Sequence, residues 1–193
     1  MNSQNSDPSR TNVRQGDDVL SGSIKRRWTV PVIVLGLVLA IAGAAYQGRA
    51  YFARGTPAPD AVFTSLKGER ISLKSLRGKM VIVNFWATSC TTCIHEMPQM
   101  VETYRRFHER GLDFIAVAMS YDPANYVLNY TETRQLPFTV ALDPQDILAK
   151  SFGDVKLTPT TFIIDKDGTI LKRFVGEPDF PALHRLLDQR LGS

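Results

Sequence analysis

The chain has 193 residues, which suggests one domain with an appendage. Its hydrophobic content of 44% is normal for a globular protein and argues against wholesale disorder. The net charge of +4 belongs to residues 1–55, with seven Lys/Arg and three Asp/Glu, because residues 56–193 hold 16 of each kind. A neutral domain lacks the basic surface of a phosphate binder, so the sequence argues against nucleic-acid binding.

The N-terminal segment has the pattern of a membrane anchor. Residues 1–27 are mostly polar, end in Lys25-Arg26-Arg27, and are expected to form a disordered cytoplasmic tail. Residues 28–46 carry no charge over nineteen positions, close to the roughly 20 apolar residues that cross a bilayer as one helix. The basic cluster before this transmembrane helix predicts a signal-anchor, with the N-terminus in the cytoplasm and the remaining chain outside.

Two other interpretations of this segment remain open. A cleaved signal peptide has a shorter apolar core of about 7–15 residues and a small-residue cleavage site, which Ala42-Gly43-Ala44 would supply. The pair Arg26-Arg27 also fits a twin-arginine export signal. Residues 47–56 then form a short linker to a domain that is expected to span residues 57–193.

This domain has the alternating pattern of an α/β fold. Strands are predicted over 61–66, 70–73, 79–86, 112–119, 138–142, 160–165 and 169–175. Helices are predicted over 92–110, 122–134, 145–152 and 181–191. Lys67-Gly68 and Asp167-Gly168 mark tight hairpin turns, Gly111 ends the first helix, and Pro98 predicts a kink in it. The layout predicts an N-terminal hairpin and a mixed central sheet flanked by helices.

The chain has only two cysteines, Cys90 and Cys93, in a C-x-x-C arrangement between a predicted buried strand and a predicted helix. A helix N-terminus stabilises a thiolate through its free N–H groups and partial positive charge, and so lowers the thiol pKa. The pattern therefore indicates redox chemistry, in which Cys90 attacks a disulfide and Cys93 resolves the mixed disulfide.

The pair has three alternative uses: an inert disulfide, a zinc site or a copper site. An inert structural disulfide would close too small a loop to stabilise the fold much. A zinc site needs about four ligands, and the three histidines, His95, His108 and His184, are scattered. A tethered copper-binding module remains an alternative, with the two cysteines and nearby Met97, Met100 or His95 as soft ligands.

Two motifs resemble the TlpA/ResA-like branch of the thioredoxin superfamily. The first runs from Asn84 to Cys93 (NFWATSCTTC) and continues with Glu96, Met97 and Pro98, and the second runs from Thr158 to Asp165 (TPTTFIID). The resemblance covers about residues 57–191. It implies a thioredoxin-like fold with a central insertion over 122–152, on the outer face of a bacterial cytoplasmic membrane.

The resemblance also implies an activity and its partners. Members keep protein thiols reduced in the periplasm, often for cytochrome c biogenesis or oxidase assembly, and a membrane electron-transfer partner recharges them. The redox-active disulfide would be the only redox group, so no bound cofactor and no metal are expected. The sequence leaves the direction of exchange open, and a protein disulfide oxidant or isomerase remains an alternative.

The resemblance assigns supporting roles to matched positions. Pro159 would be a cis-proline facing the disulfide, and Thr158 would offer backbone groups to the substrate. Glu96 would be a buried acid that moves protons during exchange, and Trp86 would pack beside the cysteines. Asn84 occupies the position where cytoplasmic thioredoxins carry a buried aspartate. This difference agrees with the membrane-anchored branch and shifts the proton transfer to Glu96.

Overall fold

The computed structural model describes residues 33–43 and 55–192. The chain divides into residues 1–53 and 54–193. Residues 33–43 are helical with exposed side chains, and among the described residues no helix is long and apolar enough to span a bilayer. The predicted tail, most of the linker and both ends of the predicted span lie outside the described residues.

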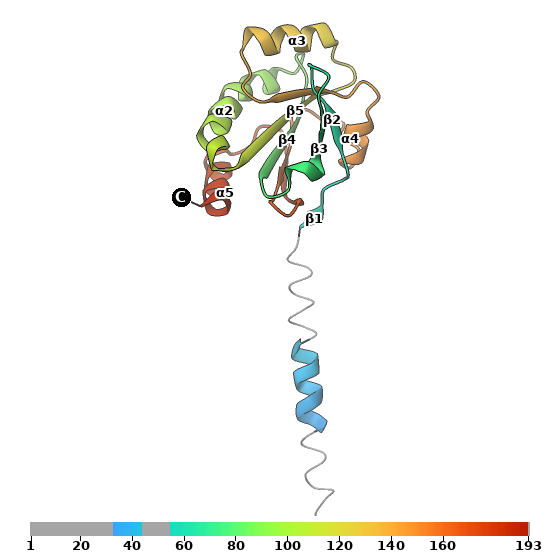
Figure 1. Cartoon of the computed structure of the whole chain (residues 1–193), viewed down its shortest axis with the longest axis vertical. Helices are drawn as coiled ribbons and strands as arrows, with labels where there is room; N and C mark the ends of the chain where they lie inside the picture. Colours follow the sequence, from blue (N-terminus) through green and yellow to red (C-terminus); the bar gives the residue numbers. More distant parts are fainter. Residues whose placement is uncertain (1–32, 44–54, 193) are drawn as a thin grey trace, which may run out of the picture. The chain divides into compact units, whose positions relative to one another are not determined.

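A six-stranded mixed sheet forms the centre of the second part, as the sequence predicts (Figure 1). The strand order is β1-β8-β7-β4-β5-β6, in which β4, β5 and β6 are parallel and β7, β8 and β1 are antiparallel to their neighbours. The bounds are β1 (Thr56–Pro57), β4 (Met80–Trp86), β5 (Leu112–Ala118), β6 (Thr139–Leu142), β7 (Thr160–Ile164) and β8 (Thr169–Val175). Every residue of β4 is buried, because strands and helices surround it on all sides.

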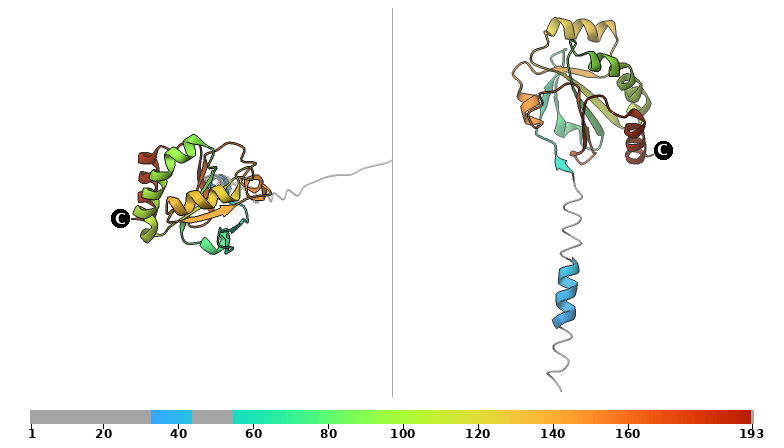
Figure 2. Two further views of the ribbon diagram at one scale, coloured as in Figure 1. Left: turned by 90° about the horizontal axis from the view of Figure 1, so that it is seen from above. Right: turned by 180° about the vertical axis from the view of Figure 1, so that it is seen from behind.

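Successive side chains of β4 point to opposite faces of the sheet, and each face carries its own hydrophobic core. Met80, Ile82 and Trp86 pack with residues of α2 (Thr91–Phe107), α3 (Ala124–Thr133) and α5 (Phe180–Leu191). The intervening Val81, Val83 and Phe85 pack on the opposite face with residues of α4 (Ile147–Ser151) and the N-terminal hairpin. Figures 1 and 2 show α2 and α5 side by side on one face of the sheet.

The predicted N-terminal hairpin is present, with shorter strands than expected. It consists of β2 (Val62–Thr64) and β3 (Arg70–Ser72), followed by a 3-10 turn, η1 (Leu73–Leu76). The side chain of Ser65 accepts hydrogen bonds from the N–H groups of Lys67 and Glu69 at 3.2 and 3.1 Å. These bonds stabilise the turn and end β2 two residues before the predicted boundary.

The helices also begin and end differently from the sequence prediction. The first ends in a separate 3-10 turn, η2 (His108–Arg110), before Gly111, whose φ of 100° favours glycine. The α4 helix covers only part of the predicted 145–152, because the Asp143 carboxylate accepts the N–H groups of Leu148 and Ala149 and fixes its start. The elements α3, β6 and α4 all lie in the predicted insertion.

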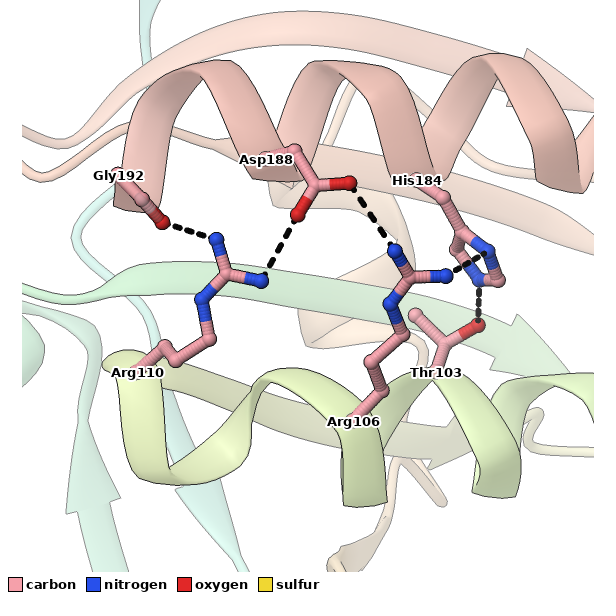
Figure 3. A network of polar contacts seen from close by, with 6 residues as sticks. All are labelled: Thr103, Arg106, Arg110, His184, Asp188 and Gly192. Atoms are coloured by element: carbon pink, nitrogen blue, oxygen red, sulfur yellow. Dashed lines mark hydrogen bonds and ion pairs between the residues drawn. The ribbon is translucent and has the colours of Figure 1, made fainter.

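A polar network holds the C-terminal helix against α2. Figure 3 shows Asp188 of α5 between Arg106 and Arg110, with ion-pair distances of 3.1 and 2.8 Å. Nearby, the Thr103 hydroxyl contacts His184 Nε2 at 2.8 Å. Since the Asp188 pairs are partly exposed, packing of the apolar faces of these helices stabilises their association more than the charges do.

Candidate active site

The two cysteines form a disulfide at the start of α2. Cys90 is the N-cap residue, and its Sγ accepts a hydrogen bond from the N–H of Cys93 at 3.1 Å. The two Cα atoms are 5.2 Å apart. Cys93 is fully buried, whereas Cys90 is partly exposed. Cys90 is therefore the more accessible residue of the pair.

The fold explains why the pair lies at this place. The buried strand β4 ends at Trp86, and three residues, 87–89, lead directly to Cys90. The N–H of Cys90 donates to the carbonyl of Ala87 at 3.1 Å, which closes a turn before the helix. The N–H of Cys93, in the first helical turn, then points toward the sulfur of the N-cap residue. The sequence prediction of a strand, a cysteine turn and a helix is confirmed.

The loop before β7 lies at the same end of the sheet. Thr158–Pro159 is a cis peptide bond, as the resemblance implies, and Pro159 is buried. Because β7 runs antiparallel to β4 and Thr160 pairs with Phe85, this loop adjoins the end of β4 from which the cysteine loop starts. The hydroxyl of Tyr121 contacts the Thr158 hydroxyl at 3.2 Å.

Glu96 is a fully buried carboxyl on the same helix as the cysteines. It follows Cys93 by three residues, a spacing that places two side chains on one helix face. Its Oε1 accepts a hydrogen bond from Asn84 Nδ2 at 3.0 Å, and its Oε2 has no partner among the described residues. Burial raises the Glu96 pKa from 4.5 to about 8; the Asn84 hydrogen bond opposes this shift and the charge of Glu177 adds to it.

Asn84 links this carboxyl to the sheet. Its Nδ2 also donates to the hydroxyl of Thr161 at 2.9 Å. Thr161 was not singled out in the sequence, although Asn84 and Thr161 are direct partners across β4 and β7. The register of these strands, which no local pattern encodes, brings the two residues together.

Trp86 ends β4 and is completely buried. It belongs to the core cluster that includes Cys93, and its ring centroid lies 5.3 Å from that of Tyr130 on α3. The side chain therefore packs in the same apolar core cluster as the buried cysteine.

Two further contacts near the cysteines were not predicted. The carboxylate of Asp122 accepts two hydrogen bonds from Thr88, in the turn before Cys90. Glu177, in the loop after β8, pairs with His95 at 3.2 Å and accepts a hydrogen bond from Gln99 at 3.3 Å. Each contact joins residues at least 34 positions apart, so neither leaves a short-range signal in the sequence.

The three histidines each contact a different partner. His184 contacts Thr103, His108 stacks on Tyr104 and His95 pairs with Glu177. Among residues 33–43 and 55–192, no group of three or more His, Cys, Asp and Glu side chains is placed to hold a metal ion.

Comparison with known proteins agrees with this geometry. Residues 53–187 match the Redoxin family. The chain is 40% identical over 163 residues to a protein named thiol-disulfide oxidoreductase ResA from Bacillus thuringiensis subsp. konkukian, covering 81% of this chain and 91% of that one. The ResA of Bacillus subtilis is 31% identical over 153 residues, covering 79% and 84%.

Solved structures show the same fold. A thiol:disulfide interchange protein of the thioredoxin family from Chlorobium tepidum superposes with a TM-score of 0.66 at 32% identity, covering 72% of this chain and 99% of that one. StoA from Bacillus subtilis superposes with a TM-score of 0.57 at 26% identity, covering 67% and 98%. With a C-x-x-C disulfide at the start of a helix in a thioredoxin-like fold, this chain belongs to the Redoxin family and is a ResA-like thiol–disulfide oxidoreductase.

Proposed function

We propose that this oxidoreductase reduces disulfide bonds of proteins outside the cytoplasm, with Cys90 and Cys93 as its catalytic residues. The observation that carries the proposal is the contrast between the two cysteines: Cys90 is partly exposed at the N-cap of α2, and Cys93 is buried one turn later. An accessible sulfur at a helix N-terminus suits a nucleophile, because the helix stabilises the thiolate.

In the first step, the Cys90 thiolate attacks one sulfur of a substrate disulfide. A bond forms between Cys90 Sγ and that sulfur, the substrate S–S bond breaks, and the other substrate sulfur leaves as a thiolate. The N–H of Cys93, which bonds to Cys90 Sγ in the oxidised protein at 3.1 Å, would stabilise the attacking thiolate.

In the second step, Cys93 loses its proton and attacks Cys90 Sγ. The Cys90–Cys93 disulfide re-forms, and the substrate leaves as a dithiol that has gained two electrons. Glu96 is the proposed proton acceptor, because its pKa of about 8 is close to that of an ordinary thiol, near 8.5.

Three further residues would support the exchange. Thr158 and Pro159 adjoin the end of β4 from which the cysteine loop starts, so an extended substrate segment would bind beside them. Trp86, in the same buried cluster, would help to keep water away from Cys93. The dithiol itself carries the two electrons, so the proposed reaction uses no bound cofactor or metal.

The proposed location is the outer face of a bacterial cytoplasmic membrane. Residues 1–27 would form the cytoplasmic tail, 28–46 the anchor, 47–56 the linker and 57–193 the catalytic domain. A membrane electron-transfer partner would return the disulfide to the dithiol, and cytochrome c or oxidase assembly would supply substrates. N-terminal sequencing of the mature protein tests the anchor: an intact N-terminus supports it, and a new N-terminus after Ala44 would show a cleaved signal.

The reduction potential of the Cys90/Cys93 couple tests the direction of exchange. Equilibration with glutathione buffers, read by thiol alkylation, should give a value near or below about −220 mV, toward the thioredoxin end of the known range. A value near about −120 mV would match a strong oxidant. In that case the reductase proposal would give way to a protein disulfide oxidant or isomerase.

A further inference from the structure

Asp122 is a buried carboxylate that the proposed exchange does not use. Only 6% of its surface is exposed, although it lies in the loop between β5 and α3. Its Oδ2 accepts the backbone N–H of Thr88 at 2.6 Å, and its Oδ1 accepts the Thr88 hydroxyl at 2.5 Å. Both oxygens therefore bind the same residue, and hydrogen bonds to a charged acceptor are the stronger kind.

Thr88 lies inside the turn that leads to the nucleophile. The N–H of Cys90 donates to the carbonyl of Ala87, so Thr88 and Ser89 form the middle of this turn. Ser89 is exposed, whereas Thr88 is held from the side by Asp122. A shift of Thr88 would move the backbone of Cys90 and, with it, the direction in which Sγ points.

The segment that carries Asp122 is itself fixed to the sheet. The N–H of Met119 donates to the carbonyl of Trp86 at 3.0 Å, and the N–H of Asp122 donates to the carbonyl of Met119 at 3.0 Å. Asp122 thus reaches Thr88 from a rigid base rather than from a free loop. Such rigid support is what the positioning of a nucleophile requires.

We propose that Asp122 is a positioning residue for disulfide exchange, because it holds the turn at Thr88 and so orients the Cys90 sulfur for attack. The inference rests on the proposed role of Cys90 as the nucleophile. It does not depend on which substrate the protein meets or on the direction of electron flow.

Asp143 provides a matched control for this role. It is also a buried carboxylate with two hydrogen bonds, from the N–H groups of Leu148 and Ala149 at 3.1 and 2.8 Å. Those bonds fix the start of α4 and involve neither Thr88 nor the cysteine loop. A purely structural buried carboxylate is thus available in the same chain.

The test measures how fast the reduced full-length protein attacks oxidised glutathione. Cys90 forms a mixed disulfide and releases one glutathione thiolate, and Cys93 then releases the second glutathione. Reactions are run at a series of pH values and quenched with acid. The second-order rate constant is taken as the high-pH plateau of a fit to the ionisation of Cys90. Urea unfolding of each variant gives its stability.

Asp122→Asn should lower the plateau rate constant at least tenfold, because an amide offers one acceptor oxygen where Thr88 presents two donors. Asp143→Asn should stay within about twofold of the unchanged protein at a comparable loss of stability. Thr88→Ser, which keeps both donors, should also stay within twofold, and Thr88→Val should fall between these limits. If Asp122→Asn does not fold, the plateau rate constants of Thr88→Val and Thr88→Ser are compared instead to test the role of the Asp122–Thr88 contact.

Three results would overturn the inference. One is a plateau rate constant within twofold of the unchanged protein for Asp122→Asn, or for Thr88→Val where that variant decides. The inference is also overturned if Asp122→Asn shifts only the midpoint of the pH–rate profile and leaves its plateau unchanged. That result would mean that Asp122 acts only through its charge. The third is an equal loss of rate in Asp143→Asn, which would reduce the role to stability. A failure of the reductase proposal would be separate, because oxidised glutathione reports the attack by Cys90 whatever the potential of the couple.

Discussion

The side-chain amide of Asn84 donates one hydrogen bond to Glu96 Oε1 at 3.0 Å and a second to the Thr161 hydroxyl at 2.9 Å. This residue occupies the position where the resemblance would place a buried aspartate in a cytoplasmic thioredoxin. In this protein the neutral amide of Asn84 donates instead to Glu96, the one buried acid on α2. The arrangement concentrates the proton chemistry of the site on Glu96.

Replacing Glu96 with Gln should slow the resolving step by roughly 100-fold, at the low end of what a positioned general base contributes. The unchanged protein should resolve its mixed disulfide faster as the pH rises, with a midpoint of about 8 set by Glu96. The variant should lose that component and keep only the titration of the thiol itself. Rapid-quench measurement of mixed-disulfide decay between pH 6 and 10 checks this prediction; an unchanged profile would remove Glu96 from the mechanism.

The same substitution should change how stability depends on pH. The folded protein holds the Glu96 proton up to about pH 8, whereas the unfolded chain releases it near 4.5. The stability contributed by this group is therefore complete below pH 4.5 and is lost as the pH rises to about 8. Urea unfolding of the oxidised protein should show that Glu96→Gln gains stability relative to the unchanged protein across this window, with no further gain above it.

Replacing Asn84 with Ala should raise the Glu96 pKa further, because the hydrogen bond from Asn84 opposes the effect of burial. The loss of both donated bonds should also cost about 1–3 kcal/mol of stability, as it leaves a buried acceptor unpaired. Carboxyl NMR titration of Glu96 checks the direction of the pKa change. A pKa that falls in Asn84→Ala would contradict the hydrogen-bond assignment.

The unequal exposure of the two cysteines predicts different outcomes for their serine variants. Cys90→Ser should abolish turnover, because the remaining thiol at Cys93 is fully buried. Cys93→Ser should instead attack substrates and remain bound to them as mixed disulfides, since no second thiol is present to resolve them. Non-reducing gels with mass spectrometry would identify the trapped proteins, and Cys90→Ser serves as the control. Trapping by Cys90→Ser and not by Cys93→Ser would reverse the assigned roles.

The sequence by itself determined the chemistry of this protein and the local structure that carries it. A buried β-branched run followed by C-x-x-C and an amphipathic pattern is enough to place Cys90 at a helix start, because strand and helix periods and N-terminal electrostatics are local properties. The second motif was enough to predict the cis bond at Pro159. The mixed sheet and the N-terminal hairpin followed from the alternation of elements and their turn residues.

Only the tertiary structure decided which distant residues surround the cysteines. Asp122, predicted as the first residue of a helix, precedes α3 and instead binds Thr88, 34 positions earlier. Thr161 meets Asn84 across 77 positions because of the register of β7 on β4. The pKa of Glu96 depends on burial by the whole core. These features arise from the packing of elements far apart in the chain, and a local pattern of residue types carries no record of such packing.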